Sequence, residues 1–387
     1  MEVLKKRAYN FRWATVPEGV IPFTAADPDF PAASAIQEAL HDYVKSGPLS
    51  YGPAEGLPEF REAVARYLLG KGISGESGDH AKRILATDGA ASALFLTVRA
   101  MLAVGEEAVV SDPVDFLFEA AVEAAGGQVR RVPFSRERGI DLEVLQDIVS
   151  PRTRLICLCS PHNPFGRLLR REELEVVARL ADENDVYILS DEIWSDITYE
   201  SHHVATASNS IAAPRTFSIG GFSKSFGLAG LRIGYVHAPT EKDFSHLLAR
   251  STAQATAYGS TTLSQVAATA ALENGQQWLA EFRQHLHDAR SLTCSGLDCL
   301  PDLDCPYPEA TYLATPQIIW GNLDAEQFCE FLIKEAKVAA IPGIPRFFGP
   351  GVAGHIRFSF ATSLGLIEEA LQRIQSVWPK RHEWSES

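Results

Sequence analysis

Short apolar runs alternate with helical patterns through the middle of this chain. Candidate strands are residues 154–159 (RLICLC), 186–189 (VYIL), 216–219 (TFSI) and 233–236 (IGYV), and residues 172–183 carry apolar side chains at helical spacing between the first two. Strands separated by helices in this way build βαβ units and a mostly parallel sheet. The sequence therefore predicts an α/β fold, in which ligands bind beyond the carboxyl ends of the strands.

The segments that follow the candidate strands are rich in glycine and polar residues. They are residues 87–91 (TDGAA, after a strand at 84–86), 160–166 (SPHNPFG), 190–194 (SDEIW) and 220–227 (GGFSKSFG). Because the carboxyl ends of parallel strands meet at one edge of a sheet, we expect these four segments to form a single site.

The length of the chain favours two domains. With 387 residues it exceeds one ordinary domain. From about residue 276 the pattern changes to helical stretches around short strands near 311–315 and 356–360. We expect a large α/β domain over residues 45–275 and a smaller α+β domain formed by 1–44 and 276–387, because a 40-residue segment cannot bury a core of its own.

The charge of the chain argues against several partners. Its 35 basic and 49 acidic residues give a net charge of −14, which repels nucleic-acid phosphates. No apolar run is long enough to span a bilayer, and the basic N-terminus lacks the apolar stretch of a secretory signal. We therefore expect a cytoplasmic protein that binds neither nucleic acid nor membrane.

No metal site is expected. Cys294, Cys299 and Cys305 lie close together, but no histidine or fourth thiol stands at zinc-ligand spacing, which favours ordinary buried thiols. His202 and His203 are adjacent, and adjacent strand residues point to opposite faces, so we interpret them as a surface pair.

The polar segments contain the groups that one cofactor needs. Lys224 can form a Schiff base if its amine is neutral, Asp191 can keep a ring nitrogen protonated, and Asn163 can donate to a ring oxygen. The amides of Ala90 and Ala91, at the start of a helix, can cradle a phosphate.

Arg232 follows Lys224 by eight residues and can add positive charge to the same phosphate. A Schiff-base lysine with a carboxylate partner for a pyridine nitrogen is the set of groups that pyridoxal phosphate requires.

Several segments resemble a known family. SPHNPFG, SDEIW and FSKSFGLAGLRIGY are similar to the signature segments of fold-type I pyridoxal-phosphate enzymes, the aminotransferase class I/II superfamily. IPFTAADPDF and LSYGPAEGLPEFREAV, with CSPHNPFG and SDEIWSDITY, look most like the cystathionine β-lyase-type C–S lyases of that superfamily. The resemblance covers essentially the whole chain. It implies a large domain with a mostly parallel seven-stranded sheet and a smaller α+β domain.

The resemblance also implies roles around the cofactor. Lys224 would bind pyridoxal phosphate and move the Cα proton, Asp191 would pair with the pyridine nitrogen, and Asn163 would bond the phenolic oxygen. Ser223 and Trp194 belong to the same cofactor-binding set.

The resemblance also implies which residues lie near the substrate and at the subunit interface. Arg357 is similar to the arginine that grips the substrate α-carboxylate, with Asn163, Ala26 and Tyr312 near the substrate. Tyr51 resembles a catalytic-site tyrosine that reaches the phosphate of the neighbouring subunit, which implies a homodimer.

Each assignment has a structural alternative. A loop lysine is often only a solvated charge, an asparagine before proline is often a turn former, and an aspartate after a strand often caps a turn. Arg357 and Arg232 could be ordinary ion pairs, and Tyr51 could be interface packing.

Three positions depart from the family pattern. Asp115 stands where an aromatic residue usually stacks on the cofactor ring, so either Phe116 takes over by a local shift or the wall beside the ring is more polar. Trp194 replaces a tyrosine or histidine and can donate but not accept a hydrogen bond. Gly221 replaces a common phosphate-binding serine.

The resulting expectation is a pyridoxal-phosphate-dependent C–S β-lyase that acts on a cysteine S-conjugate or a related amino acid, in specialised metabolism. The alternatives are an aminotransferase, an oxygen-using decarboxylation or oxidative deamination of an S-conjugated amino acid, and a cofactor-binding regulator. A nicotinamide dehydrogenase is disfavoured, because no GxGxxG segment follows the first strand.

Overall fold

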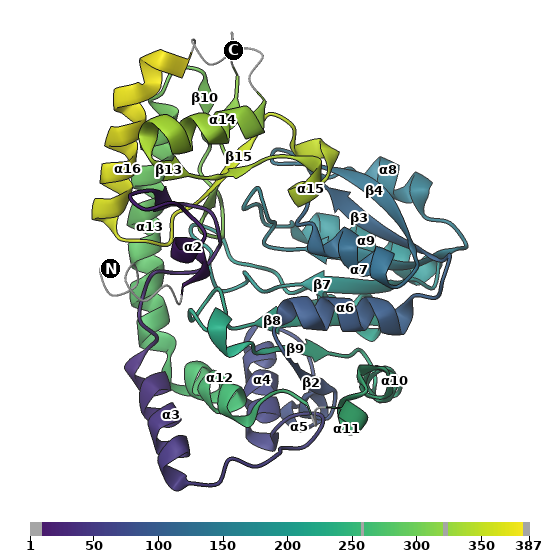
Figure 1. Ribbon diagram of the computed structural model, residues 1–387. Coiled ribbons are helices and arrows are strands. Elements are labelled where there is room, and N and C mark those ends of the chain that lie inside the picture. The colour runs from purple at the N-terminus through teal and green to yellow at the C-terminus, as the bar shows by residue number, and fades with distance from the viewer. Residues whose placement is uncertain (1–9, 257–258, 320–323, 382–387) are drawn as a thin grey trace.

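The computed structural model describes residues 10–256, 259–319 and 324–381 (Figure 1). Its centre is a sheet of eight strands in the order β2-β9-β8-β7-β6-β3-β4-β5. The strands are β2 (Ile84–Thr87), β3 (Glu107–Asp112), β4 (Gln128–Ser135), β5 (Gly139–Ile140), β6 (Thr153–Cys159), β7 (Tyr187–Asp191), β8 (Thr216–Gly221) and β9 (Gly234–His237).

The pairing of these strands confirms the α/β prediction. Strands β4, β3, β6, β7 and β8 run parallel to one another, whereas β9 is antiparallel to both β8 and β2. The resemblance implied seven strands, and the sheet has one more. The additional strand is the two-residue β5, which turns back after β4 and pairs Phe134 with Ile140.

Helices cover both faces of this sheet. Successive residues of β6 alternate between the two sides: Leu155 and Cys157 pack under α6 (Ala90–Met101), α7 (Leu117–Ala124) and α10 (Glu241–Ser251), and Ile156 and Leu158 pack against α8 (Leu142–Ile148) and α9 (Arg171–Glu183). A strand buried on both faces has a continuous apolar run, which is why the strands stand out in the sequence. Because helices cover both faces, the ends of the strands are the part of the sheet left for a ligand.

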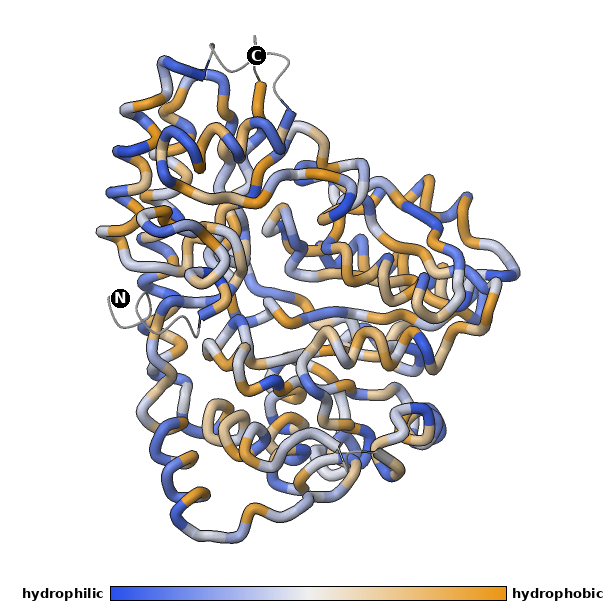
Figure 2. Tube along the Cα trace, viewed as in Figure 1, coloured by the Kyte–Doolittle hydropathy of each residue, from blue (hydrophilic) through white to orange (hydrophobic). Residues whose placement is uncertain are grey.

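The C-terminal part contains short strands and longer helices. These elements are α13 (Gln276–Asp298), β10 (Leu303–Asp304), β11 (Leu313–Ala314), β12 (Gln317–Ile318), α14 (Ala325–Phe331), β13 (Val338–Ala339), β14 (Ile341–Pro342), α15 (Pro345–Phe348), β15 (Ile356–Ser359) and α16 (Leu364–Val377). Figure 2 shows hydrophilic and hydrophobic residues alternating along α16, whose buried side chains recur at helical spacing.

The N-terminal segment packs on this C-terminal part. It contains α2 (Phe11–Ala14) and β1 (Ile21–Pro22), and β1 pairs in parallel with β13. The next helix, α3 (Ser34–Ser46), instead lies against α12 (Thr262–Asn274), which belongs to the other side of the proposed boundary. The division at residues 45 and 275 stays a proposal.

The remaining α-helices of the described chain are α4 (Pro58–Gly70), α5 (Ser77–Ala81) and α11 (Ala253–Thr256). Within the three described ranges, no helix combines the length and the apolar character that crossing a bilayer requires.

Candidate active site

A cavity of about 290 Å³ lies where the strand ends meet. Its wall brings together ten of the predicted cofactor-binding and substrate-binding residues: Ala26, Ala90, Ala91, Asn163, Asp191, Trp194, Ser223, Lys224, Arg232 and Arg357. Gly89, Asp115, Leu117, Phe118, Cys159, Ile193, Leu228, Ala229 and Ile233 complete the wall. The segments that follow β2, β3, β6, β7 and β8 therefore form one site, together with the segment after β1 and strand β15.

Lys224 supplies the amine of this cavity. Its Nζ donates to the backbone oxygen of Ala26 at 2.7 Å and lies 5.3 Å from the centre of the Trp194 ring. Loss of solvent lowers the pKa of Lys224 to about 8, although Asp27 and other nearby carboxylates act in the opposite direction. A large fraction of this amine is therefore neutral at mildly alkaline pH, as a nucleophile requires.

Asp191 is the last residue of β7 and supplies a carboxylate. Its Oδ1 accepts a hydrogen bond from the backbone N–H of Ile193 at 3.1 Å. Loss of solvent raises the pKa of Asp191 to about 7, with a further rise from Asp115 and a decrease from Lys224. A buried carboxylate of this kind favours a cationic donor beside it, which a protonated pyridine nitrogen would provide.

The start of α6 forms an anion cradle. Gly89 precedes the helix with a φ of +94°, and no side chain caps the first amides of Ala90 and Ala91. A Cβ at residue 89 would stand 2.9 Å from Nη2 of Arg232. Free N-terminal amides beside a guanidinium suit a phosphate group. Together with Lys224, this donor set fits pyridoxal phosphate.

Three polar side chains form a row along another part of the wall. Nδ2 of Asn163 donates to Oδ2 of Asp115 at 2.7 Å, and Nη1 of Arg357 donates to Oδ1 of Asn163 at 3.0 Å. Nη2 of Arg357 donates to the backbone oxygen of Thr24 at 3.2 Å. The amide of Asn163 thus joins an acid to the arginine expected to bind substrate.

The structure places Asp115, not Phe116, on the cavity wall. The ring of Phe116 is 47% exposed, and its backbone N–H donates to the oxygen of Phe347 at 3.0 Å. Of the two alternatives at this position, the geometry favours the more polar wall. Gly221 leaves space beside it, since a Cβ there would meet its neighbours only at 3.5 Å.

Tyr312 lies directly behind the wall. Its hydroxyl donates to the Ala26 oxygen at 3.1 Å, and its buried ring packs edge-on against Trp194 with 4.6 Å between ring centres. Tyr51, in contrast, is 84% exposed in the single chain and does not line the cavity. Its expected role at a neighbouring subunit stays a proposal.

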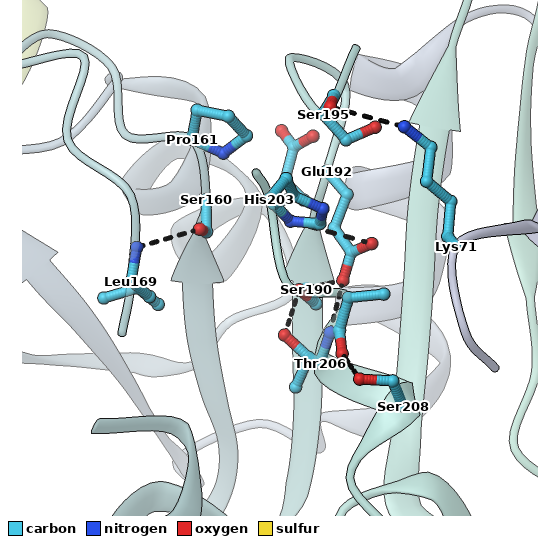
Figure 3. A network of polar contacts seen from close by, with 12 residues as sticks. Lys71, Ser160, Pro161, Leu169, Ser190, Glu192, Ser195, His203, Thr206 and Ser208 are labelled. Carbon is cyan, nitrogen blue, oxygen red and sulfur yellow. Dashed lines mark hydrogen bonds and ion pairs between the residues drawn. The ribbon is translucent and has the colours of Figure 1, made fainter. Parts of the chain in front are cut away.

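A second polar network lies behind β7, and the sequence analysis did not identify it (Figure 3). Glu192 accepts from the Ser190 hydroxyl and from the Thr206 N–H, both at 2.9 Å, and burial raises its pKa to about 7. The only signal in the sequence is an acid directly after Asp191. This network anchors the segment that carries Asp191.

The interpretation of His203 as a surface residue is wrong. Its side chain is only 1% exposed, 4.0 Å from the Glu192 carboxylate, and burial lowers its pKa to about 3. Residue 203 does not lie in a strand, and Figure 3 shows its ring beside the Glu192 side chain. In the parts of the chain that the structure describes, no cluster of three or more metal-ligating side chains occurs.

All six cysteines are free thiols, and five of them are buried as expected. The prediction of a buried thiol is wrong for Cys299, which is exposed.

The family of the chain follows from comparison with known proteins. The model of the family "Aminotransferase class I and II" matches residues 18–374. The chain belongs to this family. A putative aminotransferase of Bacillus subtilis is 33% identical and aligns over 94% of this chain and 93% of its own length. An aspartate aminotransferase of Pyrococcus abyssi is also 33% identical, over 92% of this chain and 91% of its own.

Solved structures agree with the fold. The aromatic aminotransferase of Pyrococcus horikoshii superposes with a TM-score of 0.87 at 30% identity, over 96% of this chain and 98% of that one. The protein is a pyridoxal-phosphate-dependent, aminotransferase-like enzyme of fold type I. These comparisons do not support the expected closeness to C–S lyases, and transamination, the alternative reading, fits them better.

Proposed function

We propose that the protein is an aminotransferase that moves an amino group between an amino acid and a 2-oxo acid. The observation that carries the proposal is that the Lys224 amine and the Arg357 guanidinium share one small cavity with an anion cradle. The names of the relatives, which include aspartate and aromatic aminotransferases, support the same reaction class.

Different residues would hold the cofactor and move the substrate proton. Pyridoxal phosphate, when bound, draws electrons from the substrate Cα. Ala90, Ala91 and Arg232 would hold its phosphate, and Asp191 would hold its ring nitrogen. Lys224, with its lowered pKa, would take a proton from the substrate Cα and pass it to the cofactor carbon that receives the amino group.

The substrate is held by its carboxylate. Nε of Arg357 is buried and has no hydrogen-bond partner in the described part of the chain, so a donor remains for a carboxylate. Nε can form one arm of a bidentate pair with a carboxylate, and the second N–H of an Nη group can form the other, which would hold the amino acid with its Cα toward Lys224.

Two further points belong to this proposal. We propose a homodimer in which Tyr51 reaches the partner's cofactor phosphate, since its ring is exposed in the single chain. We propose the cytoplasm as its compartment, because all six cysteines are unpaired thiols.

The test is mass spectrometry of the products formed by the holoenzyme in air. Aspartate, an aromatic amino acid and an S-alkyl-cysteine are each incubated with 2-oxoglutarate, with Lys224→Ala as the inactive control. A 2-oxo acid that keeps the substrate side chain, formed together with glutamate, supports transamination.

Other products identify the competing activities. Pyruvate with a free thiol from S-alkyl-cysteine indicates the C–S β-lyase activity expected from the sequence, and oxygen consumption with loss of carbon dioxide indicates oxidative decarboxylation. Full turnover by Lys224→Ala contradicts the assignment of the amine. Cofactor binding without formation of any product would support the alternative that the protein is a cofactor-binding regulator.

A further inference from the structure

We propose that Asp115 is a positioning residue for the substrate carboxylate, acting through the Asn163 amide on the guanidinium of Arg357. This inference rests on the proposed function, in which Arg357 binds that carboxylate. Its basis is the row of hydrogen bonds from Asp115 to Asn163 at 2.7 Å and from Asn163 to Arg357 at 3.0 Å.

The row allows only one orientation of the Asn163 amide. Its NH₂ group faces the Asp115 carboxylate, and its oxygen faces the Arg357 guanidinium, so each end meets a group of complementary charge. A flipped amide would place NH₂ against the cation and oxygen against the carboxylate. The acceptor oxygen of Asp115 therefore selects the amide orientation that holds Arg357.

Asp115 is itself fixed to the fold. Its Oδ1 accepts from the N–H of Leu117, the first residue of α7, at 3.1 Å, which leaves Oδ2 for Asn163. Asn163 and Arg357 are both buried, and hydrogen bonds to charged groups are stronger where water is excluded. The position of the guanidinium is thus tied to α7.

The row also fixes which donors of Arg357 remain. Nη1 is held by Asn163 and Nη2 by the Thr24 oxygen, so the plane of the guanidinium is set before substrate enters. Nε is buried and without a partner among the described residues. A guanidinium held in this way loses less entropy on binding a carboxylate.

The aromatic residue that relatives are expected to carry at this position cannot act in this way. A ring can stack on the cofactor but offers Asn163 no carboxylate acceptor. The structure places the acid, and not the neighbouring ring of Phe116, on the wall.

The test measures binding of maleate to the holoenzyme by calorimetry, because this carboxylate has no amino group and does not react. Asp115→Ala removes the acceptor and is expected to weaken maleate binding about 10-fold or more. Asp115→Asn keeps an oxygen that accepts from Asn163 and is expected to stay within about 3-fold of wild type. Arg357→Ala is the control and loses binding.

The outcomes separate the two proposals. If Asp115→Ala binds maleate as wild type does while Arg357→Ala does not, the positioning role is overturned and the proposed function stands. If Arg357→Ala binds maleate with wild-type affinity, the assignment of Arg357 as the carboxylate-binding residue is wrong, and the proposed function loses its substrate site. Loss of binding in Asp115→Ala with recovery in Asp115→Asn supports the inference.

A second variant serves even if Asp115→Ala does not fold. Asp115→Leu replaces the carboxylate by an apolar side chain of similar size and leaves the Asn163 amide without its acceptor, so its maleate affinity should fall as in Asp115→Ala. A maleate affinity in Asp115→Leu equal to that of Asp115→Asn overturns the positioning role.

Discussion

The amine of Lys224 donates a hydrogen bond to the backbone oxygen of Ala26 across 2.7 Å. The N-terminal segment thereby contacts the reacting amine, although the two residues are 198 positions apart in the chain. Tyr312 donates to the same oxygen, so one carbonyl links the N-terminal segment, the lysine loop and the C-terminal part. Loss of water at this junction lowers the pKa of Lys224.

The first prediction concerns the pH dependence of cofactor capture. Because the pKa of Lys224 is lowered from 10.5 to about 8, its neutral fraction rises around pH 8 and then levels. Stopped-flow absorbance of the cofactor-free protein should show a capture rate that reaches a plateau above this pH. The reaction of N-acetyl-lysine methylamide with the same cofactor is the control, and its rate should rise well beyond pH 9. A protein profile that matches the free amine contradicts the lowered pKa.

The same shift has a consequence for stability. Between pH 8 and 10.5 the unfolded chain holds a proton on Lys224 that the folded chain has released, so this residue makes a contribution to stability that increases with pH. Urea unfolding of the cofactor-free wild type and of Lys224→Met across this window measures that contribution. Equal pH slopes for the two proteins would argue against it.

The second prediction is that Gly89→Ala weakens cofactor binding. At φ +94° and ψ 166° a side chain is strained, and its Cβ would push on Arg232 from 2.9 Å. We expect the dissociation constant of pyridoxal phosphate to rise about 10-fold, which corresponds to about 1.4 kcal/mol. Gly78→Ala, in the short helix α5 with no atom within 4 Å of the added Cβ, should leave it unchanged. Equal affinities of the two variants for pyridoxal phosphate would contradict the assignment of the start of α6 as the phosphate site.

The third prediction concerns the support of the loop that carries Asn163. Glu173 is buried and accepts hydrogen bonds from Nη1 of Arg167 at 2.8 Å and from the Arg170 N–H at 2.7 Å. Removal of its carboxylate would leave the buried guanidinium of Arg167 without its counter-ion. Glu173→Ala should lower the free energy of unfolding by about 3 to 5 kcal/mol in urea titrations. The neighbouring Glu172 is exposed, and Glu172→Ala should cost less than about 0.5 kcal/mol. Similar values for both variants would refute the structural role of this ion pair.

The fourth prediction links stability to chemistry through Arg12. This fully buried arginine donates to the oxygens of Pro22 at 2.7 Å and Ser359 at 2.9 Å, and it pairs with Asp29 at 3.6 Å. Arg12→Ala leaves these acceptors unpaired and should destabilise the protein by about 3 kcal/mol or more.

The same variant should alter the environment of Lys224, because the segment that Arg12 holds contains Ala26. We expect the pH midpoint of cofactor capture to move upward, toward the ordinary lysine value. Arg66→Ala, at a half-exposed ion pair, serves as the control and should change neither quantity appreciably. An unchanged pH midpoint in Arg12→Ala would show that the N-terminal segment does not influence the pKa of Lys224.

Much of the α/β core could be read from the sequence. The strand predicted at 154–159 is β6, and the helix predicted at 172–183 is α9, because a strand buried on both faces and a helix with one apolar stripe leave local patterns. The site residues that follow these strands were found for the same reason. Strands β3, β4 and β5 were not identified from the sequence. For the two-residue β5 the reason is its length, since so short a strand has no detectable period.

The sequence by itself determined the α/β architecture, the position of the site at the strand ends and the cofactor class, because these depend on local periodicity and on residues next to strands. Only the tertiary structure decided that Asp115 and not Phe116 faces the cavity. Phe116 is held by a backbone bond to Phe347, more than 200 residues away, and no local pattern reports such a contact. The same holds for buried His203 and Arg12, whose surroundings form only when distant segments pack together and exclude water.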